Sequence, residues 1–492
     1  MAASVTSPFM YMKLSQRTSL WCRAALGSPI VRWRSASLLA PLLAGLLLAS
    51  CSDQSIAVED PPVGEEHPAG GSTTLYNATS NAFSLPAPNL SGAGLQLHFR
   101  GDASFEATFV TAPATVNGGL GPIYNNTSCI SCHARDGRGR PPLPGETTAS
   151  MLFRISVPGQ AEDGGPAPVP GFGGQLQERS IFGRQTEATM TISYRDSIGR
   201  FADGSEYRLQ IPRYAPGSSY RPLPSDLQIS PRVAPPVFGL GLLEAVSEAT
   251  ILAGVDEGDA DGDGISGRPN YVWDIEKGRR AIGRFGWKAN SPTLLQQVAA
   301  AYSGDMGVTS SLFPVESCHG QPQADQDDSD DPEISDDLLR ATAYYTQTLG
   351  VPARRNTGEA TVRRGERLFR EANCSGCHRP TMVTGVLDGI PEVSGQKIAP
   401  YTDMLLHDMG EGLSDGRPDY LAGENEWRTP PLWGIGLTQV INGHTNFLHD
   451  GRARSLIEAI MWHGGEAERS REFVRKLPAA DRAALLAFLQ SL

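Results

Sequence analysis

Two short motifs limit what this chain can be. "CISCH" occupies Cys129–His133 and "CSGCH" occupies Cys374–His378, in a chain of 492 residues with only seven cysteines. In each motif two cysteines stand three positions apart, and a histidine directly follows the second. From one turn of chain, such cysteines can form thioethers with both vinyl groups of a haem, and the histidine becomes the proximal iron ligand. The sequence therefore predicts two covalently attached haem c groups.

Other uses of a Cys-x-x-Cys pair fit this chain less well. The two halves of a zinc site usually lie closer in sequence than Cys129 and Cys374 do. A thioredoxin-like dithiol needs a strand-to-helix turn in a βαβ unit, and neither motif has that setting. Of the other cysteines, Cys22 would leave with the leader, and Cys318 is expected to be a buried, inert thiol.

The N-terminus has the pattern of an export signal. Residues 1–50 hold five basic residues and no acidic one, followed by the apolar run Leu38–Leu48. Such a run is too short to span a bilayer but suits the core of a signal peptide. "LASC" at Leu48–Cys51 resembles a bacterial lipobox, whose cysteine is lipidated; an ordinary signal peptide is the alternative. We expect a lipoprotein signal peptide over 1–50 and a lipid anchor on Cys51.

Composition suggests three further parts. Residues 51–94 are rich in Pro, Gly, Ser, Asn and acidic residues, and predict a flexible acidic tether. Residues 95–350 are expected to form an N-terminal haem domain with an insertion, and residues 351–492 a C-terminal cytochrome c domain. With the lipid anchor, this arrangement places the protein on the periplasmic side of a bacterial membrane, the outer membrane rather than the inner.

Three helices can be predicted from local patterns. Ser335 can cap a helix that continues through "LLRATAYYTQTL". Apolar residues from Val362 to Phe369 recur at near-helical spacing just before the second motif. Leu485, Leu489 and Leu492 form an i, i+4, i+7 stripe at the C-terminus. The last two helices are expected to cross each other, as they do in a small cytochrome domain.

The formal net charge of −12 disfavours nucleic acid as a partner, because phosphate binding needs a basic face. An acidic protein of this kind can instead dock to a basic redox partner.

Longer blocks carry a resemblance to a known family. They include "GLGPIYNNTSCISCHARDGRG", "DGDGISGRPN", "GRFGWKA", "LLHDMGEGLSDG", "EWRTPPLWGIG" and "FLHDGRARSLIEAIMWHGGEA". From Leu95 to Leu492 the chain resembles the bacterial dihaem oxidoreductases, whose members carry labels such as thiol oxidoreductase or peroxidase. That family is more distantly similar to the dihaem cytochrome c peroxidases.

The resemblance implies a mainly α fold of two cytochrome c-like haem domains with extended loop-rich insertions. It also implies electron transfer between the haems and a peroxidase-like reaction at one of them. The implied partners are a redox donor or acceptor protein and the cytochrome c maturation machinery. Two alternatives stay open: an electron-transfer dihaem cytochrome without substrate chemistry of its own, and a surface module that works with metal-uptake partners.

The sixth ligand of each iron decides whether a haem catalyses a reaction or only transfers electrons, because an iron without a sixth protein ligand can bind a substrate. Met409 and Met306 are the candidate sulfur ligands, and Met409 is favoured because it follows its own haem motif. The histidine candidates are His407, His444, His449 and His463, and a structural role is the alternative for each. Related peroxidases often place a sulfur ligand directly before "HDG"; here that residue is Leu448, which cannot bind iron.

Two further features are suggested partly by the resemblance. Trp287 is a candidate relay, since related enzymes place a tryptophan between the haems; a packed core residue is the alternative. Asp259, Asp261 and Asp263 fall at positions one, three and five of a calcium-loop pattern, whose twelfth residue is Asn270 in place of glutamate. Related peroxidases also hold calcium, so these carboxylates are candidate Ca²⁺ ligands, with a solvated acidic turn as the alternative.

Overall fold

The computed structural model describes residues 68–143, 146, 150–324 and 332–492. The described residues of Ser55–Leu492 form one compact unit. The predicted signal peptide and the lipidation residue Cys51 lie outside the described residues. Within those residues, no helix has the length and apolar character needed to cross a membrane.

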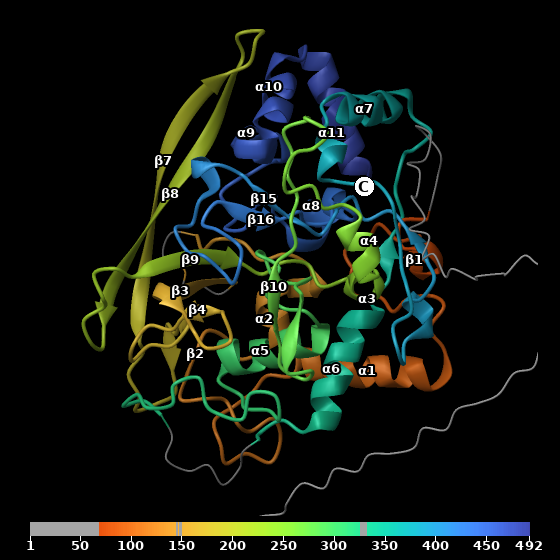
Figure 1. The fold of residues 1–492 in the computed structure, drawn as a ribbon. Coiled ribbons are helices and arrows are strands. Elements are labelled where there is room, and N and C mark those ends of the chain that lie inside the picture. Colours follow the sequence, from red (N-terminus) through yellow and green to blue (C-terminus); the bar gives the residue numbers. More distant parts are fainter. Residues whose placement is uncertain (1–67, 144–145, 147–149, 325–331) are drawn as a thin grey trace, which may run out of the picture. The chain divides into compact units, whose positions relative to one another are not determined.

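The helices are short and spread along the chain (Figure 1). They are α1 (Gly92–Glu106), α2 (Cys129–Cys132), α3 (Leu240–Ala245), α4 (Glu248–Leu252), α5 (Leu294–Met306), α6 (Asp336–Thr348), α7 (Ala360–Glu371), α8 (Thr438–Asn442), α9 (Leu456–Trp462), α10 (Glu468–Lys476) and α11 (Ala479–Ser491).

The strands form one four-stranded sheet and several two-stranded ones. They are β1 (Thr74–Leu75), β2 (Ile123–Tyr124), β3 (Met151–Gln160), β4 (Pro166–Ala167), β5 (Gln175–Leu176), β6 (Arg179–Ser180), β7 (Ala188–Arg200), β8 (Glu206–Ser219), β9 (Gln228–Val233), β10 (Tyr271–Asp274), β11 (Arg279–Ile282), β12 (Val351–Pro352), β13 (Met382–Val383), β14 (Lys397–Ile398), β15 (Leu406–Asp408) and β16 (Glu426–Arg428).

The expectation of a mainly α fold is wrong. Helices make up 30% of the structure and strands 21%, so this is not a mainly α cytochrome c fold. The difference lies largely in residues 151–233, which the sequence reading treated as a loop-rich insertion. There β3 pairs with β4, β5 and β9, and β7 pairs with β8 in a long ribbon. Alternating apolar residues bury one face of β3, the period-2 pattern of a half-buried strand.

Two pairs of helices are built alike, one beside each Cys-x-x-Cys-His motif. α1 packs on α6, and α7 packs on α11. Each crossing is made at a glycine: a Cβ on Gly101 would collide with the carbonyl oxygen of Ala341, and one on Gly365 with that of Ala484. One turn after each glycine, a phenylalanine lies near the histidine of the motif. The ring centres of Phe105 and His133 are 6.1 Å apart, and those of Phe369 and His378 are 6.4 Å apart.

All three predicted helices are confirmed. The Ser335 side chain accepts a hydrogen bond from the backbone N–H of Leu338 and begins α6. α7 buries Val362, Leu368 and Phe369. α11 buries Leu485 and Leu489 against α7, as the C-terminal stripe predicts.

Residues 68–94, placed in the tether by the sequence reading, are packed in the structure. Phe83 is 1% exposed and stacks on Phe238, with ring centres 4.0 Å apart. β1 pairs in parallel with β12. The folded body therefore includes these residues.

Residues from the two predicted haem domains pack together in common buried clusters. The largest buried cluster combines Leu243 and Tyr345 with Met404 and Trp433. The β7–β8 ribbon, at the left of Figure 1, ends beside the C-terminal helices. There Arg482 Nη2 donates to Asp203 Oδ2 at 2.7 Å, and the Arg482 guanidinium lies 4.0 Å from the centre of the Phe201 ring. A domain boundary between residues 350 and 351 stays a prediction.

Candidate haem-binding cavity

Both motifs line one cavity. All six of their cysteine and histidine residues are in its wall: Cys129, Cys132, His133, Cys374, Cys377 and His378. The cavity has an empty volume of about 3230 Å³, including the part open to solvent. β3, β9, α9 and α11 each contribute side chains to the remaining wall. The structure thus brings together two motifs that are far apart in the sequence.

The first motif starts as one helical turn, α2, and ends at His133. Nδ1 of His133 donates to the carbonyl oxygen of Pro235 at 2.7 Å, which leaves Nε2 with its lone pair. Burial lowers the pKa of His133 to about 4, so the imidazole is neutral at pH 7. Burial also raises the pKa of Cys129 and of Cys132 to about 12, so both side chains are protonated thiols. Nucleophilic dithiols have lowered pKa values instead.

The second motif has the same arrangement. Cys374 lies in a 3₁₀ turn over Cys374–Gly376, and Nδ1 of His378 donates to the carbonyl oxygen of Tyr401 at 3.0 Å. Burial, followed by repulsion from His463, lowers the pKa of His378 to about 4. A hydrogen bond from the far imidazole nitrogen to a carbonyl is the usual way in which proteins orient a metal-binding histidine.

Two candidate histidines are occupied by protein partners. His407 Nδ1 bonds to Glu466 Oε2 at 2.7 Å and Nε2 bonds to Asp403 Oδ2 at 2.8 Å. His444 uses both nitrogens for the backbone, since Nε2 donates to the Arg138 carbonyl and Nδ1 accepts from Asn446 N–H. These contacts favour the structural role that the sequence analysis gave as the alternative for each residue.

The other four candidates line the cavity, as His407 also does. Met306 is 3% exposed at the end of α5. Met409 is half-buried and joins the apolar cluster that contains Leu448. His449 stacks on Trp427, with ring centres 3.8 Å apart, and its Nε2 has no hydrogen-bond partner among the described residues. His463 directly follows α9.

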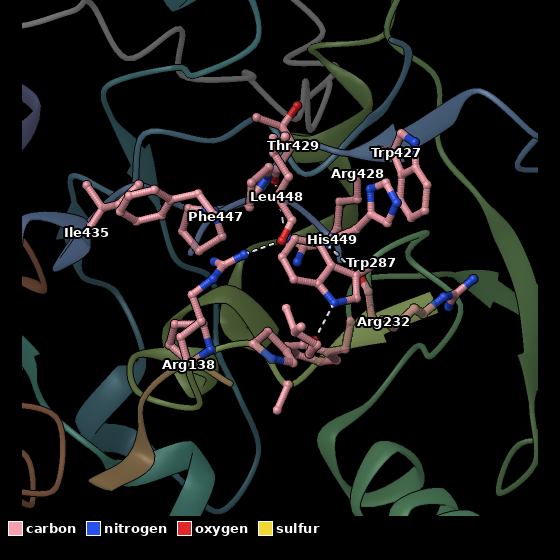
Figure 2. A pocket seen from close by; sticks show the side chains of 18 of the residues that line it. Arg138, Arg232, Trp287, Trp427, Arg428, Thr429, Ile435, Phe447, Leu448 and His449 are labelled. Atoms are coloured by element: carbon pink, nitrogen blue, oxygen red, sulfur yellow. Dashed lines mark hydrogen bonds between the residues drawn. The ribbon is translucent and has the colours of Figure 1, made fainter. Parts of the chain in front are cut away.

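Trp287 lies in the cavity wall (Figure 2), and it is 7% exposed. Its indole N–H donates to the carbonyl oxygen of Val233 at 2.9 Å. The guanidinium of Arg138 lies 5.1 Å from the centre of the indole ring and also donates to the Leu448 carbonyl. Trp287 is therefore a packed residue that also borders the space shared by both motifs.

The acidic loop is only partly arranged as the sequence predicts. In the described part of the chain, one group of three His, Cys, Asp or Glu residues has ligand atoms within 4.8 Å of one another: Asp256, Asp259 and Asp261. Asp256 precedes the loop pattern, which is why the pattern misses it. Asp263 instead accepts a hydrogen bond from Asn373 Nδ2 at 3.0 Å, directly before the second motif.

Buried charges beside the cavity are a feature that sequence reasoning missed. Lys288 and Asp415 are both fully buried and form an ion pair of 2.9 Å. Arg232, in the cavity wall, pairs with Asp419 at 3.0 Å. Arg154 also lines the cavity, and its guanidinium has no hydrogen bond or ion pair with another described residue. Burial lowers the pKa of Arg154, and the charge of Asp305 partly offsets this effect. No local sequence signal marks these residues, because their partners lie far away along the chain.

The chain's own residues fit two haem groups. Each motif presents two thiols and a neutral imidazole whose Nε2 has no hydrogen bond to another described residue, and both motifs face one cavity. These sites define a protein that holds two haems.

The comparison with known families agrees with this class. The sequence model of the family described as "Di-haem oxidoreductase, putative peroxidase" matches residues 64–492. The chain belongs to this family, and the resemblance stated from the sequence is confirmed. No curated protein matches the chain.

Proposed function

We propose that this protein is an exported oxidoreductase that passes electrons between two covalently bound haem c groups and reduces a peroxide at one of them. Cys129 and Cys132 would attach the first haem, and Cys374 and Cys377 the second. His133 and His378 would bind the two irons through Nε2. The observation that carries the proposal is the single cavity that both motifs line.

Peroxide reduction suits a protein with two redox groups. One molecule of H₂O₂ takes up two electrons and two protons and yields two molecules of water. When bound, each haem supplies a one-electron couple, and an iron with an open face can bind peroxide. The chain supplies the fixed distance, the exclusion of water and the side chains between the two groups.

Trp287 is the side chain that we propose as the electron path. Its ring borders the shared cavity, and the hydrogen bond from its indole N–H to the carbonyl oxygen of Val233 holds the ring in one orientation. Burial lowers the pKa of Arg138 to about 10, so Arg138 keeps its positive charge at pH 7 beside this ring. That charge disfavours a long-lived tryptophan cation. Trp287 would therefore act as a tunnelling bridge between the haems.

The test is peroxide reduction by the haem-loaded protein with a reduced electron donor. Trp287→Phe should keep both haems and slow turnover by about tenfold, or ~1.4 kcal/mol of barrier. Trp273→Phe is the matched control, because Trp273 lies outside the cavity wall. It should turn over peroxide like the unchanged protein.

The opposite result favours the alternative function. If the unchanged protein shows two low-spin haems in every redox state and no peroxide turnover, it is an electron-transfer cytochrome without substrate chemistry. High-spin iron in at least one haem supports the enzyme.

Calcium remains part of the proposal. Three carboxylates within 4.8 Å repel one another unless a cation lies between them, so Asp256, Asp259 and Asp261 are the candidate ligands in the folded protein. The loop also contacts the second motif through Asp263 and Asn373. Bound Ca²⁺ would therefore stiffen the wall of the second haem site.

The proposed location follows from the N-terminus alone. The family match starts at residue 64, after the lipobox-like Leu48–Cys51. We propose that Cys51 carries a lipid and holds the protein on the periplasmic side of a bacterial membrane, the outer rather than the inner. The proposed partners are the cytochrome c maturation machinery and a redox donor or acceptor protein.

A further inference from the structure

Three histidines in the cavity wall share one arrangement. In each, Nδ1 donates to a backbone carbonyl: His133 to Pro235 at 2.7 Å, His378 to Tyr401 at 3.0 Å and His463 to Ala459 at 2.7 Å. A carbonyl oxygen can only accept, so Nδ1 carries the proton and Nε2 keeps the lone pair. This is the form in which an imidazole binds iron. Two of the three are the histidines of the haem motifs, and His463 is the third.

Other described histidines differ from this arrangement. His407 and His444 use both nitrogens for protein partners. His449 lies flat on Trp427, and His98 bonds to Thr348 away from the cavity wall. His319 is exposed.

The position of His463 associates it with the second motif. Leu456 and Ile460 of α9 pack on the apolar cluster that contains Phe369, and Cys374 of the second motif packs on the same cluster. Leu456, Ile460 and His463 are spaced i, i+4, i+7 and all line the cavity, so one face of α9 leads to His463. The first turn of α9 is fixed by the cap that Ser455 makes to the Glu458 N–H.

The pKa of His463 is shifted by the same cause as the pKa values of His133 and His378, namely burial. His463 is half-buried and lines the cavity, and burial lowers its pKa, so the ring is neutral at pH 7. A neutral imidazole of this kind needs no proton release before it binds a metal.

We propose that Nε2 of His463 is the sixth ligand of the iron that His378 holds. The proposal rests on the proposed binding of two haems and deepens it. The second haem would then be six-coordinate with two histidines, as suits an electron-transfer group. His463 would supply the side-chain iron ligand that Leu448 cannot provide.

The proposal assigns the substrate reaction to the first haem site. There Arg154, on β3, lines the cavity, and its guanidinium has no hydrogen bond to another described residue. A guanidinium in this state can bind an anion or an oxygen-rich substrate through its N–H groups.

The test is the spin state and reduction potential of each haem in the purified, haem-loaded protein, measured by electron paramagnetic resonance, near-infrared magnetic circular dichroism and redox titration. His463→Ala should keep both haems but turn one low-spin haem into a high-spin one, and added imidazole should restore the low-spin signal. His463→Met should stay low-spin, show the thioether-to-iron charge-transfer band, and raise the potential of that haem. His444→Gln is the matched control, because both ring nitrogens of His444 already have backbone partners; it should change neither spin state.

An unchanged low-spin spectrum in His463→Ala would overturn the proposal. A loss of the low-spin signal in Met409→Ala, with His463→Ala unaffected, would also overturn it and identify Met409 as the ligand. If His463→Ala fails to fold, His463→Met keeps the question decidable, since only an iron ligand produces the new charge-transfer band. None of these spectra depends on peroxide turnover, so failure of this proposal and failure of the peroxidase function are distinguishable.

Discussion

A single buried imidazole, His407, connects the pH dependence of stability to the second haem site. Burial lowers its pKa, but the hydrogen bonds with Asp403, with Cys377 of the second motif and with Glu466 outweigh burial and raise the pKa well above 6.5. As the pH rises, His407 therefore loses its proton at a higher pH in the folded state than in the unfolded chain. This contribution to stability is complete below the unfolded pKa of His407 and is lost as pH rises through the folded pKa.

The thermal midpoint should report this proton. We expect the midpoint of the unchanged protein to fall between pH ~6 and pH ~9, and His407→Gln to show a smaller fall. At pH ~6 the variant should also be less stable by about 3–5 kcal/mol, because Asp403 and Glu466 lose their cation. His319→Gln, at an exposed site, is the control. Equal falls in the variant and in the unchanged protein would contradict the assigned role.

At the scale of elements, the structure depends on two close helix crossings. α1 on α6 and α7 on α11 each bring a glycine against the backbone of the partner helix. The crossing sets the position of the phenylalanine one turn later, which lies near the motif histidine. At both sites, helix packing therefore places a phenylalanine ring against the motif histidine.

A methyl group at the second crossing should separate the helices. Gly365→Ala gains helix propensity, but its Cβ would collide with the carbonyl oxygen of Ala484, so we expect a net loss of about 1–3 kcal/mol. Gly358→Ala is the control, because its Cβ meets no atom within 4 Å. Its thermal midpoint should stay close to that of the unchanged protein. A Gly365→Ala protein as stable as this control would show that α7 and α11 do not pack this closely.

At the scale of the whole molecule, the two haem sites should load separately although they share one cavity. Each motif has its own cysteines and its own carbonyl partner, Pro235 for the first and Tyr401 for the second. Occupancy of one site therefore does not require the thiols of the other.

Haem content measures this separation. Cys374→Ala should halve the covalently bound haem per chain, as determined by the pyridine haemochrome assay. Cys318→Ala is the control, because Cys318 lies in neither motif and is 1% exposed. It should leave the haem content unchanged. A full haem complement in Cys374→Ala would mean that the second motif is not an attachment site.

The sequence by itself determined the features that depend on neighbouring residues. The two Cys-x-x-Cys-His motifs, the cap at Ser335 and the apolar stripes of α7 and α11 are all local patterns, set by covalent spacing and helical period. The family resemblance followed from equally local blocks. For the same reason the fold class was missed: the strands of residues 151–233 are stabilised by pairing with distant segments, which no short window displays.

Only the tertiary structure decided how the sites are built. Both motifs line one cavity in the fold, and the motif histidines bond to the carbonyl oxygens of Pro235 and Tyr401. The fold also pairs Lys288 with Asp415. It also distinguished the candidate ligands, since two carboxylates bond to His407, whereas Nε2 of His463 has no hydrogen bond to any residue that the structure describes. The physical reason is the same in each case. A hydrogen bond or ion pair between residues far apart in the chain depends on how the backbone folds, and a residue's type alone does not reveal which partner it will meet.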